Sequence, residues 1–187
     1  MAKLIYFGNV SLNGYTTDDQ GKFDFTEPDD EVHSFVNDAL RDIGTHLYGR
    51  RMYETMMLWE TEPQLAEASP IYRDFAEIWN QAEKVVYSST LPAVQTTRTR
   101  LEREFNPDAV RRLVAASDRD VLIGGPTLAT HAFRAGLIDE CHMIVIPIII
   151  RAGTKFLPDD VRFELQLIDT HQFGSGAVYL RYGRRNQ

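Results

Sequence analysis

The chain has 187 residues, a single cysteine and a formal net charge of -7. This length fits one compact domain over residues 1–187, and such a domain should bury roughly 70% of its unfolded surface without needing disulfides. The acidic balance excludes a general nucleic-acid binder, because phosphate contacts need a basic face. The chain is already polar at Asn9, too early for a signal peptide or a membrane span, so we expect a cytoplasmic protein.

The N-terminal part of the chain shows a strand pattern followed by a helix pattern. Leu4 to Val10 is an apolar run of strand length, and the following Asn13-Gly14 indicates a turn. The polar segment from Tyr15 to Pro28 is expected to be a mobile surface loop. A helical stripe follows, formed by Val32, Phe35, Val36, Ala39, Leu40 and Ile43. We expect this helix to stop at Gly44.

The middle of the chain alternates between strands and helices. In chain order we expect the strand Thr45 to Tyr48, a helix opening at Gly49, a helix near Ile71 to Ala82, the strand Lys84 to Tyr87, a helix near Pro107 to Ala116, the strand Val121 to Ile123 and a helix from Thr127 to Ala135. This alternation is typical of an α/β domain.

The C-terminal part lacks a helical pattern. Cys141 to Ile150, Phe163 to Phe173 and Val178 to Tyr182 are expected to be strands. We expect two of them to pair antiparallel through the turn Gly174-Ser175-Gly176. No repeat or linker interrupts the sequence, which therefore predicts one domain.

Three junctions after predicted strands carry residues suited to phosphate: Gly49-Arg50-Arg51, Ser88-Ser89-Thr90 and Gly124-Gly125-Pro126-Thr127. The carboxyl ends of strands in an open α/β sheet form the ligand crevice, so the three junctions can face one site. Glycines let backbone N–H groups approach a phosphate, a helix N-terminus favours negative charge, and arginine binds phosphate bidentately. Together they suit a nucleotide diphosphate that carries a further phosphate.

Each junction alone also fits a plain tight turn, a solvated loop or a solvated surface. The nucleoside-triphosphate and dinucleotide glycine signatures are absent, and no G-x-S-x-G nucleophile elbow occurs. The five histidines are scattered, without the spacing of a metal site, so we expect no bound metal.

The ordered set of motifs resembles one family. The motifs are Ser11-Leu12-Asn13-Gly14 after the first strand, Leu47 to Glu54, Val85 to Ser89, Ile123-Gly124-Gly125, and Gly136 to Glu140 with Pro147. They resemble the dihydrofolate-reductase-like superfamily, closest to the C-terminal reductase domain of the bifunctional riboflavin-biosynthesis deaminase/reductase. The resemblance spans nearly the whole chain.

The resemblance implies a three-layer αβα dihydrofolate-reductase-like fold, with a mainly parallel central sheet and a C-terminal antiparallel hairpin. It also implies NADPH as the hydride donor and a homodimer. By position, the residues implied to bind NADPH are Asn9, Val10 and Ser11 beside the nicotinamide, Gly49, Arg50 and Arg51 at the phosphates, Ser88, Ser89 and Thr90 at the adenosine ribose and its 2′-phosphate, and Ile123, Gly124, Gly125, Thr127 and Leu128 at the pyrophosphate.

The chain departs from the family pattern at three positions. Asn13 stands where the family usually has Asp, Met52 where it often has Thr, and Arg151 where it usually has Gly. These changes remove a charge from the turn, remove a hydroxyl near phosphate and add a cation near the mouth of the site. Riboflavin-pathway enzymes of this kind usually also carry a deaminase domain, whose zinc motif does not occur in this sequence.

The resemblance implies hydride transfer to a C=N or C=O carbon of a small heterocycle, such as 5-amino-6-(5-phosphoribosylamino)uracil of riboflavin synthesis. Folate-type enzymes use a buried acid on the first long helix, for which Glu31 is the nearest candidate, and a plain role at the helix N-terminus is the alternative. Substrate-lining candidates are Phe23, Phe25, Tyr53 and Trp59. Dihydrofolate-type pterin reduction and a non-catalytic NADP(H)-binding module stay open as alternatives.

Overall fold

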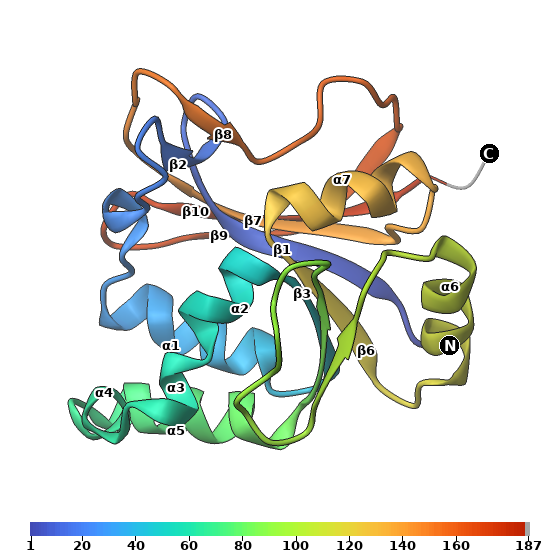
Figure 1. The fold of residues 1–187 in the computed structure, drawn as a ribbon. Helices are drawn as coiled ribbons and strands as arrows, with labels where there is room; N and C mark the ends of the chain where they lie inside the picture. The colour runs from blue at the N-terminus through green and yellow to red at the C-terminus, as the bar shows by residue number, and fades with distance from the viewer. Residues whose placement is uncertain (186–187) are drawn as a thin grey trace.

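The computed structural model describes residues 1–185 and contains an eight-stranded sheet. Its strands are β1 (Leu4–Ser11), β3 (Ile43–Gly49), β4 (Glu83–Tyr87), β5 (Thr99–Glu102), β6 (Asp120–Gly124), β7 (Glu140–Ile146), β9 (Leu165–Gln172) and β10 (Val178–Arg184). The order is β5-β4-β3-β6-β1-β7-β10-β9 (Figure 1). The first six strands of this order run parallel, whereas β10 pairs antiparallel with both β7 and β9. The predicted fold class is therefore confirmed.

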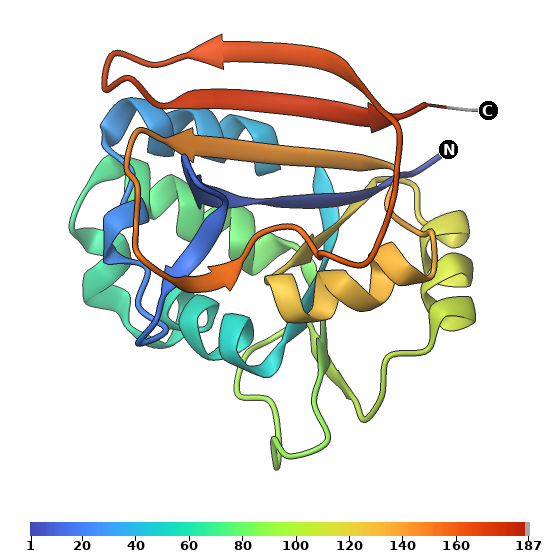
Figure 2. The ribbon, with the colours of Figure 1, turned by 90° about the horizontal axis from the view of Figure 1, so that it is seen from above.

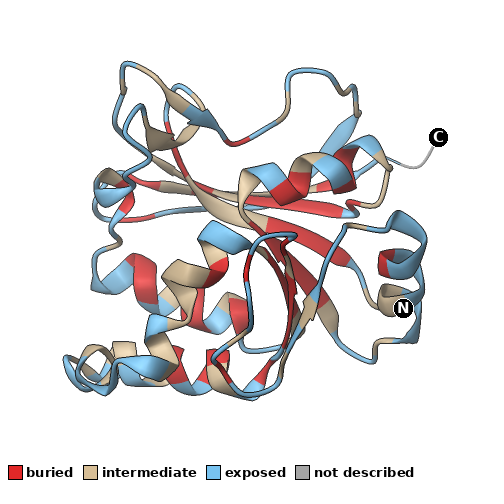
Figure 3. Cartoon of the chain, in the orientation of Figure 1, coloured by how far each residue is buried: buried red, intermediate tan, exposed pale blue. Residues whose placement is uncertain are grey.

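Helices cover both faces of the sheet, as the view from above shows (Figure 2). They are α1 (Asp30–Leu40), α2 (Arg50–Met56), α3 (Leu58–Thr61), α4 (Pro63–Glu67), α5 (Pro70–Gln81), α6 (Pro107–Ala116) and α7 (Pro126–Arg134), with a 3-10 turn η1 (Asp24–Thr26) before α1. α1, α2 and α5 pack into one hydrophobic core, and α6 and α7 pack into a second core on the opposite face. The buried residues accordingly lie on the strands and on the inward sides of the helices (Figure 3).

The long helices start where the sequence supplies a cap. The Asp29 side chain accepts from the Val32 amide at α1, and Ser69 accepts from Tyr72 at α5. Such caps satisfy amide groups that have no partner inside the helix. The predicted hairpin is also present, because β9 and β10 are joined through residues 173–177.

The predicted end of the first helix is wrong, because α1 ends at Leu40 and Gly44 lies inside β3. The Arg119 side chain donates to the carbonyls of Arg41 and Asp42, which lets the chain leave the helix before the glycine. Ile43 is buried as the first residue of β3.

The predicted strand from Cys141 to Ile150 is too long, since β7 ends at Ile146. Pro147 follows, and a proline has no N–H to continue a ladder. The Ile150 backbone instead bonds the side chain of Asn13.

The prediction that the segment from Tyr15 to Pro28 is a loop is wrong in part, because it contains a strand and a 3-10 turn. β2 (Tyr15–Asp18) pairs antiparallel with β8 (Gly153–Lys155) in a separate two-stranded sheet near the carboxyl end of β1. The two strands approach closely at Gly153, where an added Cβ would lie 1.7 Å from the Thr17 carbonyl oxygen.

We expect Gly153→Ala to break the pairing of β2 with β8 and to cost about 1–3 kcal/mol, as other overpacked sites do. Hydrogen exchange at residues 15–18 should become faster, because their partner strand moves away. Gly176→Ala is the matched control, because Gly176 also has a positive φ but lies in the β9–β10 hairpin, where an added Cβ meets only the Pro147 side chain at 3.7 Å. Unchanged exchange at residues 15–18 in the Gly153 variant would contradict the close approach.

Among residues 1–185, no helix has both the length and the apolar character needed to span a membrane.

Candidate functional site

The sheet brings the three predicted junctions to one edge. β3, β4 and β6 are parallel neighbours, with Tyr48 opposite Gly124 and Gly49 opposite Tyr87. All three strands therefore end together, and α2 and α7 begin side by side at this edge (Figure 1).

Two helix N-termini at this edge have no side-chain cap. Gly49 is the N-cap residue of α2, Gly125 is the N-cap residue of α7, and neither helix receives a side-chain hydrogen bond there. Amide groups at such ends point outward and favour an anion. The pair therefore forms a cradle suited to phosphate.

Glycine is required in this cradle for two physical reasons. A Cβ on Gly124 would lie 2.9 Å from the Tyr48 ring, so the strand could not pack with a side chain there. Gly125 has φ +90, a conformation that side chains disfavour. Met52, where the family often has Thr, lies beside both glycines and gives the cradle an apolar wall.

A buried polar cluster holds Tyr48 in place beneath Gly124. The His46 Nδ1 lies 2.6 Å from the Tyr48 hydroxyl, and the Trp79 indole donates to the same hydroxyl over 3.2 Å. Burial, helped by the nearby charge of Lys84, lowers the pKa of His46 to about 3, so this histidine is neutral. No local sequence pattern marks this cluster, so it could not be predicted.

Arginine side chains flank the cradle at the start of α2. Arg50 is held by Glu54 over 2.7 Å and donates to the Thr90 hydroxyl over 3.1 Å. This contact links the first predicted junction to the second. Arg51 is exposed, and no other residue within 1–185 forms a hydrogen bond or ion pair with its side chain, so its guanidinium is free to bind an anion.

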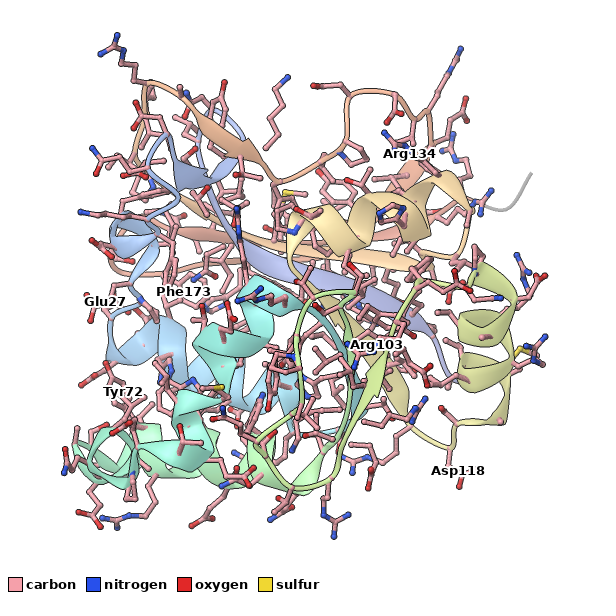
Figure 4. All side chains as sticks on the ribbon, viewed as in Figure 1. Glu27, Tyr72, Arg103, Asp118, Arg134 and Phe173 are labelled. Atoms are coloured by element: carbon pink, nitrogen blue, oxygen red, sulfur yellow. The ribbon has the colours of Figure 1, made fainter. Side chains whose placement is uncertain are left out.

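The loop after β4 uses Ser88 to shape itself. The buried Ser88 hydroxyl accepts from the amides of Thr90 and Leu91. Arg103, labelled in Figure 4, donates to the Leu91 carbonyl over 2.7 Å and so also holds this loop. Ser89 and Thr90 are the exposed members of this junction.

The end of β1 presents Asn9, while its neighbours serve the fold. Val10 is buried in the core beneath α7. The buried Ser11 hydroxyl donates to Asn13 and accepts from the Tyr15 amide. Ile123 and Leu128, at the end of β6 and the start of α7, are likewise core residues, so only their backbones can reach a ligand.

The contacts of Asn13 account for an amide at this position, where the family pattern usually has Asp. Its Nδ2 donates to the Ile150 carbonyl over 2.7 Å, and its Oδ1 accepts from the Ile150 amide over 3.1 Å. Only an amide side chain can donate and accept in this pairing. Asn13 therefore ties the turn after β1 to the segment that carries Arg151.

Asn13→Asp is expected to release that segment, because a carboxylate cannot donate to the Ile150 carbonyl and would repel it. The loss should be about 1–3 kcal/mol, the usual cost of an unpaired polar group. Thermal melting and hydrogen exchange at Ile150 measure it, with Asn106→Asp as the control because that side chain only accepts, from Ala109. Full protection of the Ile150 amide in the Asn13 variant would contradict the pairing.

The predicted substrate-lining residues are dispersed. Tyr53 is only 1% exposed and its hydroxyl bonds Gln95 and Thr96, which leaves no surface for a ligand. Trp59 packs against Tyr72, labelled in Figure 4, between α3 and α5. Phe23 precedes η1 and is exposed, whereas Phe25 lies within η1 and is half-buried.

Glu31 lies at the start of α1, beside the β9–β10 hairpin. It is exposed in the first turn of α1, and its Oε2 accepts from the Gly174 amide over 2.9 Å. The adjacent Phe173 packs against α1 and is labelled in Figure 4. Glu31 thus fastens the β9–β10 hairpin to the start of α1.

A cavity of about 290 Å³ lies on the outer side of α7, between that helix and residues 154–159. Two cationic side chains line this cavity, and both already form ion pairs: Arg134 with Asp160 and Lys155 with Asp159. Among residues 1–185 no group of acidic, histidine or cysteine side chains could hold a metal ion.

Comparison with known proteins identifies the family of the chain. The model of the RibD C-terminal domain matches residues 2–179. The uncharacterized protein YyaP of Bacillus subtilis is 25% identical over 175 residues, which cover 92% of this chain and 90% of YyaP.

Two solved structures show the same fold. A putative riboflavin biosynthesis protein from Shewanella sp. PV-4 has a TM-score of 0.76 and 20% identity, with all of both chains covered. Dihydrofolate reductase from Enterococcus faecalis, complexed with NADP(H), has a TM-score of 0.67 and 16% identity over 98% of this chain and 97% of that enzyme. Since the family model matches nearly the whole sequence, the chain belongs to the RibD C-terminal domain family.

Proposed function

We propose that this protein is an NADPH-dependent reductase that transfers a hydride to a C=N or C=O carbon of a small heterocycle, in the manner of 5-amino-6-(5-phosphoribosylamino)uracil reductase. The observation that carries the proposal is the pair of uncapped helix N-termini at Gly49 and Gly125, with Arg50 and Arg51 beside them. Membership of a reductase domain family supports it.

The residues present fit this cofactor. A pyrophosphate would be held by the amides that open α2 and α7, next to the N-cap residues Gly49 and Gly125. Arg51 and the exposed Ser89 and Thr90 would hold a 2′-phosphate. When bound, NADPH supplies the hydride, and the chain's own residues bind it and orient it toward the end of β1.

Dihydrofolate-type pterin reduction is the weaker proposal. That chemistry needs an acid facing the substrate, and Glu31 instead binds Gly174 at the hairpin. A module that binds NADP(H) without turnover has the same cradle, so turnover must be tested separately.

Titration with NADPH and, separately, with NADH tests the cofactor assignment. The readouts are the fluorescence of Trp59 and Trp79 and the melting temperature. We expect NADPH to bind more tightly than NADH and to raise the melting temperature. Failure of both nucleotides to bind would overturn the reductase proposal. Oxidation of bound NADPH by a heteroaromatic substrate then separates an enzyme from a binding module.

We further propose a cytoplasmic homodimer. Edge strand β9 exposes three large apolar side chains, Leu165, Leu167 and Ile168, which supports an interface in the C-terminal third. Light scattering after gel filtration tests the dimer, and a monomer at micromolar concentration would exclude it.

A further inference from the structure

A buried tyrosine packs directly against the backbone of the cradle. Tyr48 lies opposite Gly124 in the register of β3 and β6, and it is 2% exposed. Its ring comes within 2.9 Å of the point where a Cβ on Gly124 would stand, and the Met52 side chain approaches the same point to 3.5 Å. Gly124 therefore rests against two side chains at the place where β6 leads into α7 (Figure 1).

The cradle has few constraints of its own at the start of α7. Gly124 and Gly125 carry no side chains, and Gly125 has φ +90, a conformation that glycine adopts at little cost. No side chain caps α7, and its first residue, Pro126, has no N–H. The direction of the remaining amides thus depends on how the ladder with β3 and the neighbouring side chains hold the two glycines.

The Tyr48 ring is held at its hydroxyl end by two hydrogen bonds. The Trp79 indole N–H donates to the Tyr48 hydroxyl over 3.2 Å, and an indole nitrogen can only donate. The hydroxyl hydrogen is then left for the Nδ1 of His46, which lies 2.6 Å away, so His46 carries its own proton on Nε2. The ring cannot tilt away from Gly124 without breaking these bonds.

Stability alone does not account for this polar cluster. Its three members, His46, Tyr48 and Trp79, are each at most 2% exposed. The Nε2 of His46 is buried and has no partner within residues 1–185. A buried N–H without an acceptor destabilises a fold, whereas apolar side chains of similar shape would pack here without that cost. The contact of the Tyr48 ring with Gly124 gives the cluster a role at the cradle instead.

We propose that Tyr48 is a positioning residue for anion binding: held by His46 and Trp79, its ring keeps the amides at the start of α7 aimed at a pyrophosphate. This inference rests on the proposed function, in which the same amides hold the pyrophosphate of NADPH. Because NADPH and NADH share the pyrophosphate, loss of the Tyr48 hydroxyl should weaken both nucleotides by the same factor. Replacement of the arginines at the start of α2 is expected, by contrast, to weaken NADPH more than NADH.

Inorganic pyrophosphate is the probe, because it meets the cradle without a ring or a ribose. Calorimetric titration measures its dissociation constant well below the melting temperature of each variant. We expect Tyr48→Phe to weaken pyrophosphate by about 2- to 12-fold, the range of one neutral hydrogen bond. Tyr179→Phe is the matched control, because Tyr179 on β10 is also buried and its hydroxyl also bonds a histidine, His142, over 3.0 Å. An equal loss of pyrophosphate affinity in both variants overturns the proposal.

His46 offers a conservative variant that separates positioning from stability. In His46→Asn an amide oxygen can accept from the Tyr48 hydroxyl in place of Nδ1, so this variant should keep its pyrophosphate affinity. His46→Leu cannot accept, and it should lose about as much affinity as Tyr48→Phe. If both His46 variants melt at a lower temperature and neither changes the affinity of the folded protein, the cluster is only structural and the proposal is wrong.

A double-mutant cycle tests the contact itself. An added methyl at Gly124 meets the Tyr48 ring in the wild type, whereas the shorter side chain of Tyr48→Val leaves room for it. Gly124→Ala should therefore cost less pyrophosphate affinity in the Tyr48→Val background than in the wild type. Equal losses in the two backgrounds contradict the contact. If Tyr48→Val does not fold, Tyr48→Phe and the two His46 variants still decide the proposal.

The same titrations separate failure of this inference from failure of the proposed function. If pyrophosphate binds and depends on Tyr48 while NADPH does not bind, the reductase proposal fails and the positioning role stands. If NADPH binds and Tyr48→Phe leaves both NADPH and pyrophosphate unchanged, the positioning role fails and the reductase proposal stands. No binding of pyrophosphate at millimolar concentration also overturns the positioning role.

Discussion

Replacement of Arg50 and Arg51 together by alanine is expected to weaken NADPH binding by about 10- to 100-fold, while NADH binding changes by less than about threefold. A hydrogen bond to a charged group contributes about 1.5–3 kcal/mol, and the 2′-phosphate is the only group that distinguishes the two nucleotides. Arg51 is exposed and free to move onto that phosphate. Arg50 is already positioned by Glu54 and Thr90.

The two single variants show how much each arginine contributes to NADPH affinity. Arg51→Ala should account for most of the lost NADPH affinity, since Arg50 has two partners within the chain. Arg111→Ala on α6 is the control, because Arg111 is also an exposed helical arginine, paired with Asp108. Calorimetric titration measures both nucleotides for each variant. Equal loss for NADPH and NADH would place neither arginine at the 2′-phosphate, and a large fall in melting temperature would give them a structural role.

The main elements of the fold were predictable because their patterns are local. The stripe that contains Val32 and Val36 predicts α1, and both residues are buried. Apolar runs of strand length predict β1, β4 and β6 for the same reason. The turn glycines Gly14 and Gly136 also have positive φ, as their positions in the sequence suggest.

Elements that depend on distant partners were not predictable. β2 exists because Tyr15 and Asp18 pair with residues of β8 that lie more than 130 positions away. β5 is a short edge strand, in which Thr99 and Leu101 are only half-buried, so its sequence lacks a clear apolar run. The predicted end of α1 was wrong for a related reason. The Arg119 side chain, from another part of the chain, donates to the Arg41 carbonyl at the end of this helix.

The site was predictable as a set of junctions but not as a set of side-chain roles. Parallel strands bring Gly49, Ser88 and Gly124 to one edge, as the order of elements implies. The sequence does not reveal that the Ser88 hydroxyl is already bonded within its own turn. Nor does it reveal that the Glu31 carboxylate turns to Gly174. These roles depend on tertiary contacts that residue types alone do not specify.

A second large effect is expected at the buried carboxylate of Glu140, which is 3% exposed at the start of β7. It accepts from Arg181 twice, from Lys3 and from His142. Glu140→Gln removes the negative charge on which these groups converge, and we expect a loss of about 2–4 kcal/mol. This lies toward the lower part of the range for broken buried pairs, because Arg181 and Lys3 can reach water.

The effect should depend on pH with a definite sign. Burial alone would raise the pKa of Glu140, but the hydrogen bonds from Arg181, Lys3 and His142 outweigh it and lower the pKa from 4.5 to about 2. A carboxylate whose pKa is lower in the folded state stabilises the fold fully above its unfolded pKa, and this contribution disappears as pH falls toward the folded value. The stability difference between wild type and Glu140→Gln should therefore shrink as pH falls from about 4.5 to 2.

Urea unfolding at several pH values measures this difference. Glu83→Gln is the control, because the Glu83 carboxylate forms only an exposed pair with Arg98, and such pairs contribute about 0–1 kcal/mol. If the two variants lose the same small stability at pH 7, the charge of Glu140 does not hold β1, β7 and β10 together. If the difference between wild type and the Glu140 variant grows as pH falls from about 4.5 to 2, the assigned direction of the Glu140 pKa shift is wrong.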